Sequence, residues 1–188
     1  MGCSLEKAQE FADAYNRGFK GIAKFKVKGS KFVRSHGYIV LNPITGHKTY
    51  WWDWEEWCAR QKTFTQDFWE EYRRCHKGTN DNIAKLVSMH FKAGSKWDRK
   101  ALNSVTQGTG AICLKVAARK FFDWVMDNGH FNVVKIVNFV HDELCIEYPE
   151  SMPELGKMLE KIMEETAAIY CKSLPIPAEA SVGKHWIH

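Results

Sequence analysis

Apolar residues recur with helical spacing along three stretches of the chain. After Ser4, a residue type suited to cap a helix, the first apolar stripe comprises Leu5, Ala8, Phe11, Ala12 and Tyr15. The longest helical pattern runs from Arg99 to Asn128, where Asn128-Gly129 is a usual helix stop. Its apolar face comprises Ala111, Leu114, Ala118, Phe121, Phe122 and Val125. A third helix is predicted over 153–172, with inward positions at Leu155, Met158, Leu159, Ile162, Met163 and Ile169.

Alternating apolar and polar positions predict strands elsewhere. Residues 31–41 alternate in the manner of a strand or hairpin, and the sequence NPITG (42–46) predicts a turn after them. Residues 133–140 and 144–148 flank the polar pair His141-Asp142, which predicts a hairpin with that pair at its tip. Tight tips favour Asn-Gly or Asp-Gly, so the side chains here indicate a turn selected for what it displays. Residues 180–182 are a candidate for a short final strand.

The sequence YWWDWEEW (50–57) places four tryptophans beside three acidic residues. Base stacking is one use of such aromatic side chains, but the local negative charge opposes phosphate binding. We therefore favour tryptophans that pack in the core. Helices are predicted over 54–74 and 81–91, and Ala93-Gly94-Ser95 is the clearest break in composition. The expected domains are 1–94 and 95–188.

Composition narrows the class of protein. The chain of 188 residues is 45% hydrophobic and 26% charged, as in soluble globular proteins, and it contains no apolar run long enough to span a membrane. Its six cysteines include no Cys-x-x-Cys pair. A zinc site from Cys58, Cys75, His76 and His90 matches no standard spacing, so reduced thiols in an intracellular protein are the better interpretation.

Positive charge is concentrated near the N-terminus. No acidic residue lies between Asp13 and Asp53. The basic residues of that stretch are Arg17, Lys20, Lys24, Lys26, Lys28, Lys31, Arg34 and Lys48. Such a stretch is either an ordinary solvated face or a strip that neutralises the phosphates of a nucleic acid.

Two polar sets could carry chemistry. The first is the hairpin tip with His141, Asp142 and Glu143: an ordinary surface turn, or a rigid mount on which an aspartate holds Mg²⁺. The second is Arg99, Asn103 and Gln107, whose spacing of four places them on one helical stripe. This stripe is either a solvated face or a set of donors for the acceptors that every base pair offers in the DNA minor groove.

Three segments, in this order, carry a resemblance to a known family. RKALNSVTQGTGAICLKVA (99–117), VHDE (140–143) and VGKHWIH (182–188) resemble the C-terminal part of family A DNA polymerases. Residues 3–22, CSLEKAQEFADAYNRGFKGI, are similar to the helix that follows the nucleotide-binding fingers helix of that family. The resemblance covers the whole chain, strongly over 99–188 and loosely over 1–98. The divergent 22–98 stretch suggests a phage-type enzyme.

The resemblance implies an α+β fold, in which helices pack on a small antiparallel sheet with the catalytic hairpin of a polymerase palm. Residues 1–94 would be a helical lobe from the fingers, and 95–188 the C-terminal part of the palm. Asp142 would bind catalytic Mg²⁺, Glu143 would support that site, and His141 would touch the primer terminus. The implied reaction is two-metal nucleotidyl transfer from deoxynucleoside triphosphates.

The same resemblance implies which residues bind DNA. Arg99, Asn103 and Gln107 would grip the primer–template duplex through minor-groove and sugar contacts. Further DNA-binding candidates are Lys115, Lys24, Lys26, Lys28 and Lys31. The protein would act inside a cell, in the cytoplasm of the host if a phage encodes it.

Two Mg²⁺ ions require more than one carboxylate. The family takes a second aspartate from an earlier strand motif and clamps the triphosphate with a fingers helix, and this sequence shows neither pattern. Asp53, among tryptophans, and Asp123, in a helix, are not convincing substitutes. We therefore expect a split or fragmented polymerase that needs an N-terminal polymerase polypeptide. The alternatives are a non-catalytic DNA-binding module derived from a polymerase, and a metal-dependent nuclease built on the same hairpin.

Overall fold

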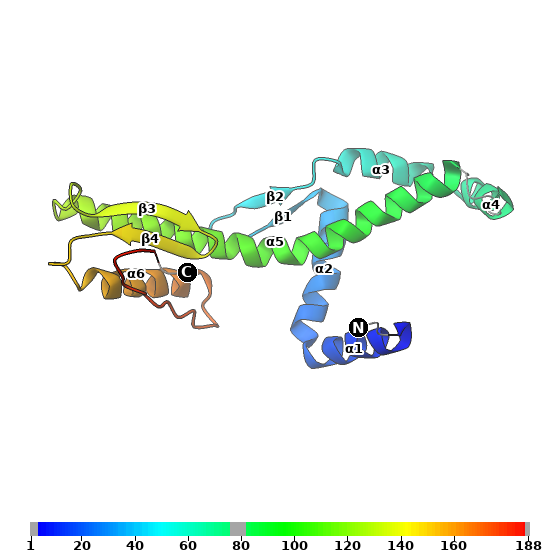
Figure 1. Ribbon diagram of the computed structural model, residues 1–188. Coiled ribbons are helices and arrows are strands. Elements are labelled where there is room, and N and C mark those ends of the chain that lie inside the picture. Colours follow the sequence, from blue (N-terminus) through cyan, green and yellow to red (C-terminus); the bar gives the residue numbers. More distant parts are fainter. Residues whose placement is uncertain (1–3, 76–81, 187–188) are drawn as a thin grey trace. The chain divides into compact units, whose positions relative to one another are not determined.

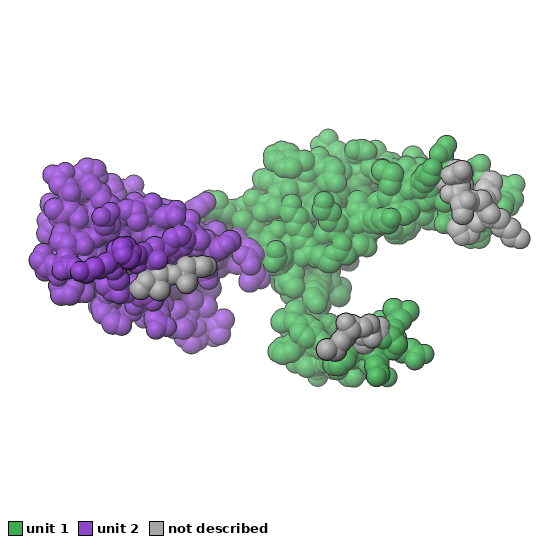
Figure 2. Space-filling view, viewed as in Figure 1, with its two compact units in different colours: residues 1–105 green, residues 106–188 purple. Residues whose placement is uncertain are grey.

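The computed structural model describes residues 4–75 and 82–186, in a helix-rich chain with two small antiparallel sheets (Figure 1). The α+β class predicted from the sequence is confirmed at this level. The chain forms two compact units, residues 1–105 and 106–188 (Figure 2). The helix α5 (Asn82–Asp127) begins in the first unit and ends in the second. The boundary between the two units therefore lies inside a helix, at Val105/Thr106.

The first unit begins with two helices, α1 (Leu5–Gly18) and α2 (Lys20–His36). The Ser4 side chain caps α1 by accepting a hydrogen bond from the backbone N–H of Lys7 at 3.3 Å. The α2 helix includes residues 31–36, where alternation had predicted a strand. Of the alternating positions 32, 34, 36, 38 and 40, the last two lie in the strand that follows and the first three lie in the helix. Burial of Gly29 and Val33, four residues apart, favours the helix there.

A short hairpin follows α2. The strands β1 (Tyr38–Val40) and β2 (Lys48–Tyr50) pair antiparallel, and the predicted turn at 42–46 connects them. The Asn42 side chain holds that turn by accepting a hydrogen bond from the backbone N–H of Ile44 at 3.0 Å. The core of this unit comprises Val33, Ile39, Trp51, Trp57, Trp97 and Ala101. Packing is thus confirmed for Trp51 and Trp57, whereas Trp52 is 93% exposed.

The next helices differ from the predicted ones. The single helix expected over 54–74 is two helices, α3 (Trp54–Thr63) and α4 (Gln66–Cys75). Phe64 ends α3, and the Thr65 side chain caps α4 by accepting a hydrogen bond from Phe68 N–H at 3.3 Å. The helix α5 continues without interruption through 93–95, where the composition changes. Gly94 is buried, and a Cβ added there would lie 3.2 Å from Nη2 of Arg34. The glycine allows α2 and α5 to pack closely, with no interruption of the helix.

The second unit packs a hairpin against two helices. The strands β3 (Lys135–Val140) and β4 (Glu143–Glu147) pair antiparallel, and α6 (Leu155–Tyr170) follows (Figure 1). The core joins α5, the segment before β3 and α6 through Phe121, Val125, Val134, Leu155 and Leu159. The helix predicted over 153–172 is confirmed as α6, which is two residues shorter at each end. Ile169, predicted to face inward, is 42% exposed.

Residues 180–182 form no strand. Carboxylates of α6 bind the backbone of this segment in place of a neighbouring strand: Glu160 accepts from Ala180 N–H at 2.7 Å and Glu164 from Ala178 N–H at 3.1 Å. Separately, none of the helices within residues 4–75 and 82–186 combines the length and apolarity that crossing a bilayer requires.

Candidate functional site

The hairpin tip is a two-residue loop, as the sequence predicted. Val140 pairs with Glu143, which leaves His141 and Asp142 as the central residues. His141 has φ of 52°, whereas Asp142 is not among the non-glycine residues with positive φ. A positive φ at a central position is typical of the tight turns that connect two hairpin strands. A histidine in this conformation is uncommon, because glycine adopts it at lower cost.

The strands that carry this tip pack against the core of the second unit. Ile136 on β3 and Leu144 on β4 pack against the buried cluster around Phe121. His141, Asp142 and Glu143 are all exposed. The hairpin therefore presents three polar side chains to solvent from an anchored base.

The donor chemistry of the tip suits a hard cation. Asp142 has no hydrogen bond or ion pair with any residue of the described ranges, so its carboxylate oxygens are available to a ligand. Carboxylate oxygens are the ligands that Mg²⁺ prefers. Within 4–75 and 82–186, however, no three His, Cys, Asp or Glu side chains lie close enough to enclose a metal ion. The chemistry of the tip thus fits part of a magnesium site, whose remaining ligands would come from other residues.

The second polar set lies on α5. Arg99, Asn103, Gln107 and Lys115 are all exposed, while Trp97 and Ala101 on the same helix are buried. The first three follow one another at four-residue intervals, so they occupy a stripe about 12 Å long at a rise of 1.5 Å per residue. The helix places long donors side by side on a solvent-facing surface, as the spacing predicted.

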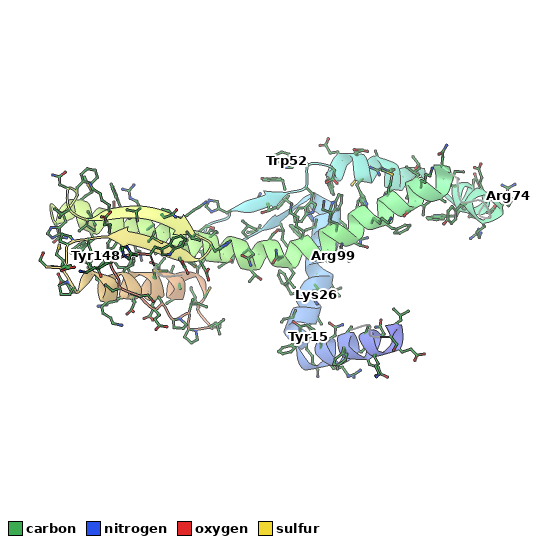
Figure 3. The ribbon with its side chains drawn as sticks, in the orientation of Figure 1. Tyr15, Lys26, Trp52, Arg74, Arg99 and Tyr148 are labelled. Carbon is green, nitrogen blue, oxygen red and sulfur yellow. The ribbon has the colours of Figure 1, made fainter. Side chains whose placement is uncertain are left out.

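The basic candidates on α2 divide into two groups. Lys24, Lys28 and Lys31 are spaced four and three residues apart, which places them on one face of the helix, and all are exposed. Lys26 lies elsewhere on α2, with its Nζ 5.1 Å from the centre of the Tyr15 ring (Figure 3). The helix therefore concentrates positive charge, and one lysine also holds α2 to α1.

Sequence reasoning missed the outward face of the β1–β2 hairpin. Tyr50 and Trp52 are exposed there, while Trp51 between them is buried. The available signal was the alternation of Lys48, Tyr50 and Trp52 with Thr49 and Trp51. This alternation was overlooked because the four tryptophans of residues 50–57 were treated as one group.

Comparison with known proteins gives matches that extend over the whole chain. The family model described as DNA polymerase family A matches residues 1–188. The chain is 36% identical over 187 residues to the thermostable DNA polymerase I of Thermus filiformis, covering 100% of this chain and 18% of that protein. It is 28% identical over 187 residues to DNA polymerase I of Borreliella burgdorferi, covering 99% of this chain and 16% of that protein.

The similarity extends to a eukaryotic protein. The chain is 25% identical over 193 residues to DNA polymerase theta of Drosophila melanogaster, covering 99% of this chain and 8% of that protein. The chain thus spans less than a fifth of the length of each of these relatives. No solved structure shows a significant match.

Proposed function

The chain belongs to DNA polymerase family A, and we propose that it forms the C-terminal catalytic portion of a DNA-directed DNA polymerase that acts in DNA replication. The reaction would be template-directed addition of deoxynucleotides to a primer. The observation that carries the proposal is the hairpin tip, where Asp142 and Glu143 are exposed on strands anchored in the core. The family match over residues 1–188 supports the same assignment.

Each residue of the tip has a distinct role in this proposal. Asp142 is the ligand of catalytic Mg²⁺, and Glu143 supports the metal site beside it. When bound, Mg²⁺ would stabilise the attacking and leaving oxygens of the phosphoryl transfer. His141, displayed at the first position of the turn, contacts the primer terminus. The fixed hairpin matters because misplacement of a catalytic group by about 1 Å is costly in rate.

DNA binding would use the two helices that expose polar and basic residues. Arg99, Asn103 and Gln107 hold the primer–template duplex from the minor groove, where acceptors are common to all base pairs. This suits an enzyme that must accept paired DNA of any sequence. Lys115 on α5 and the lysines of α2 would neutralise phosphates.

The complete enzyme would need residues beyond these 188. One aspartate and a supporting glutamate cannot balance the four positive charges of two Mg²⁺ ions. We propose that an N-terminal polymerase segment supplies the second aspartate and the side chains that bind the triphosphate, either on the same polypeptide or as a separate one. An intracellular site of action belongs to the same proposal, and the phage origin stays a prediction.

Primer extension tests this proposal. The chain is combined with the N-terminal segment, and incorporation of a labelled deoxynucleotide is measured with and without Mg²⁺. Asp142→Asn should lower the rate by about 100-fold or more, the scale of losing one essential group of an active site. Asp127→Asn, an exposed aspartate at the end of α5, is the matched control. Undiminished synthesis by Asp142→Asn would refute the role of this carboxylate.

A second candidate is a non-catalytic DNA-binding module. The exposed stripe on α5 and the lysines of α2 favour it, since neither depends on the hairpin carboxylates. The two functions separate on one variant, because Asp142→Asn removes synthesis and spares duplex affinity in an enzyme. In a pure binding module there is no synthesis to lose.

A further inference from the structure

The β1–β2 hairpin has two faces with different neighbours. Tyr38 pairs with Tyr50 and Val40 with Lys48, so these four side chains share one face. Ile39, on the opposite face, is 6% exposed and belongs to the core. The outward face thus carries two tyrosines, a lysine and Val40.

The alternation continues beyond β2. The backbone N–H of Trp51 donates to the carbonyl of Gly37 at 2.8 Å, which extends the pairing by one residue. Trp51 accordingly belongs to the core and is 6% exposed, whereas Trp52 is 93% exposed. We call Tyr38, Lys48, Tyr50 and Trp52 the aromatic face.

Each ring of the aromatic face lies beside the next, from Tyr38 through Tyr50 to Trp52. The centres of Tyr38 and Tyr50 lie 5.8 Å apart, and those of Tyr50 and Trp52 lie 6.2 Å apart. The series extends onto α2, where the centres of Phe32 and Tyr38 lie 5.4 Å apart. These contacts order the tyrosines, but they do not bury Tyr50, which is 49% exposed. Packing therefore does not account for the outer rings.

Charge distinguishes this surface from an ordinary apolar patch. The Nζ of Lys48 lies 4.4 Å from the centre of the Tyr38 ring, so a cation sits among the rings. The acidic residues that follow lie at the start of α3. Asp53, which is exposed and directly follows Trp52, is the N-cap residue, and Glu55 and Glu56 lie in the first turn, so the positive end of the helix dipole favours all three. Glu56 is further neutralised by Arg60 at 2.7 Å. Residues 14–52 contain no acid at all.

Exposed rings interleaved with a cation are the combination that binds unpaired nucleotides, since bases stack on the rings and phosphates approach the positive charge. We propose that the aromatic face binds single-stranded DNA by stacking two or more bases on Tyr50 and Trp52, with Lys48 against the intervening phosphate. Paired DNA is excluded from this contact, because its bases are already stacked on one another. The inference deepens the proposed function, in which a template strand must be single-stranded before it is copied.

Equilibrium binding tests the inference without any catalysis. Fluorescence anisotropy of a labelled, unstructured oligonucleotide of about 16 nucleotides, the upper end of the usual site size, is measured against the 188-residue chain. Trp52→Ala should weaken binding about 5-fold to 150-fold, and Trp52→Phe should restore part of it. Lys48→Ala should lower the slope of log affinity against log salt by about 0.7. Trp52 is almost fully exposed, so its replacement leaves the core unchanged.

Matched controls use exposed aromatic residues outside this face. Trp186→Ala and Phe11→Ala remove rings that are 58% and 74% exposed, and both variants should bind the single strand as the unchanged chain does. A blunt duplex of the same sequence should bind equally to Trp52→Ala and the unchanged chain. The inference is overturned if the unchanged chain does not bind the single strand, or if Trp52→Ala weakens both DNA forms equally. Neither result would bear on Asp142, so failure here is distinguishable from failure of the polymerase assignment.

Discussion

Arg34 and Asp98 join α2 to α5 through an ion pair, with Nη2 of Arg34 lying 2.7 Å from Oδ2 of Asp98. Nε of Arg34 donates to the other carboxylate oxygen at 3.2 Å, and Ser30 donates a further hydrogen bond to that oxygen. Asp98 immediately precedes Arg99, the first residue of the polar stripe. The pair thus fixes the helix at the point where the proposed duplex contacts begin.

Asp98→Asn should destabilise the chain in a pH-dependent manner. Burial alone raises the pKa of Asp98, but hydrogen bonds from Arg34 and Ser30 outweigh it and leave the pKa below its ordinary value. The carboxylate therefore contributes stability above the unfolded-state pKa of about 3.9, and this is lost as the pH falls toward the folded-state pKa. Urea unfolding at neutral pH should show a loss of up to about 1 kcal/mol for this half-exposed pair.

The difference between Asp98→Asn and the unchanged chain should shrink as the pH falls below about 4. Asp123→Asn is the control, because it breaks the exposed Arg119–Asp123 pair within a single helix. A difference that stays constant between neutral and acid pH would contradict the account.

A second pH effect should come from His90, which is 1% exposed and stacks on Trp57. Its Nε2 lies 2.6 Å from the Gln61 side-chain oxygen, an acceptor, so Nε2 carries the proton of the neutral ring. Burial, followed by the charges of Arg60 and Arg34, lowers the pKa of His90. Below the unfolded-state pKa of about 6.5 the unfolded chain binds a proton that the folded chain resists, so stability falls.

Thermal unfolding between about pH 7.5 and 5.5 measures this effect, since the window brackets the ordinary pKa of histidine. His90→Phe keeps an aromatic ring beside Trp57 and should flatten the dependence on pH. His47→Gln, at an exposed position, should leave it unchanged. An equal loss of stability at acid pH in His90→Phe would refute the role of this buried ring.

Gly37→Ala should be strongly destabilising. Gly37 ends α2 with φ of 72°, and a Cβ there would lie 2.6 Å from Cδ2 of Trp54. Gly46 has φ of 68° but nothing within 4 Å, so Gly46→Ala measures the backbone cost alone. Urea unfolding should show a loss of about 1 kcal/mol for Gly46→Ala and a further 1–3 kcal/mol or so for Gly37→Ala from the clash. Equal losses of stability in the two variants would mean that the Trp54 side chain moves aside at no cost in free energy, which would contradict the expected clash.

The salt dependence of duplex binding should separate the two kinds of DNA contact. Asn103→Ala and Gln107→Ala remove neutral donors, so they should weaken binding without changing the slope of log affinity against log salt. Lys28→Ala should lower that slope by about 0.9, because a phosphate contact is lost. Filter binding between about 50 and 200 mM salt covers the informative range. Unaltered affinity in the amide variants would remove the stripe from the duplex site.

Local chemistry accounts for what the sequence predicted correctly. The Ser4 cap, the Asn42 turn and the hairpin tip each depend on a few neighbouring residues, and the residues themselves specify them. Gly94 shows the opposite case. Its composition suggested a break, but its role is to admit Arg34 from a helix some sixty residues away in sequence. Such packing is not visible in local pattern.

The candidate site shows the same division. The sequence placed Asp142 at a tip and Arg99, Asn103 and Gln107 on one helical face, because spacing alone determines both. It did not separate Trp52 from Trp51, since their different burial follows from how Trp51 N–H pairs with the carbonyl of Gly37. Sequence reasoning thus missed the residues whose burial or exposure depends on pairing with residues elsewhere in the chain.

The central claim concerns Asp142 as a metal ligand of a polymerase. Single-turnover nucleotide incorporation by the completed enzyme, with duplex affinity measured on the same preparation, tests it most directly. The account predicts that Asp142→Asn lowers incorporation by about 100-fold or more and changes duplex affinity by less than about 2-fold. Incorporation at the unchanged rate, or a parallel loss of duplex binding, would contradict it.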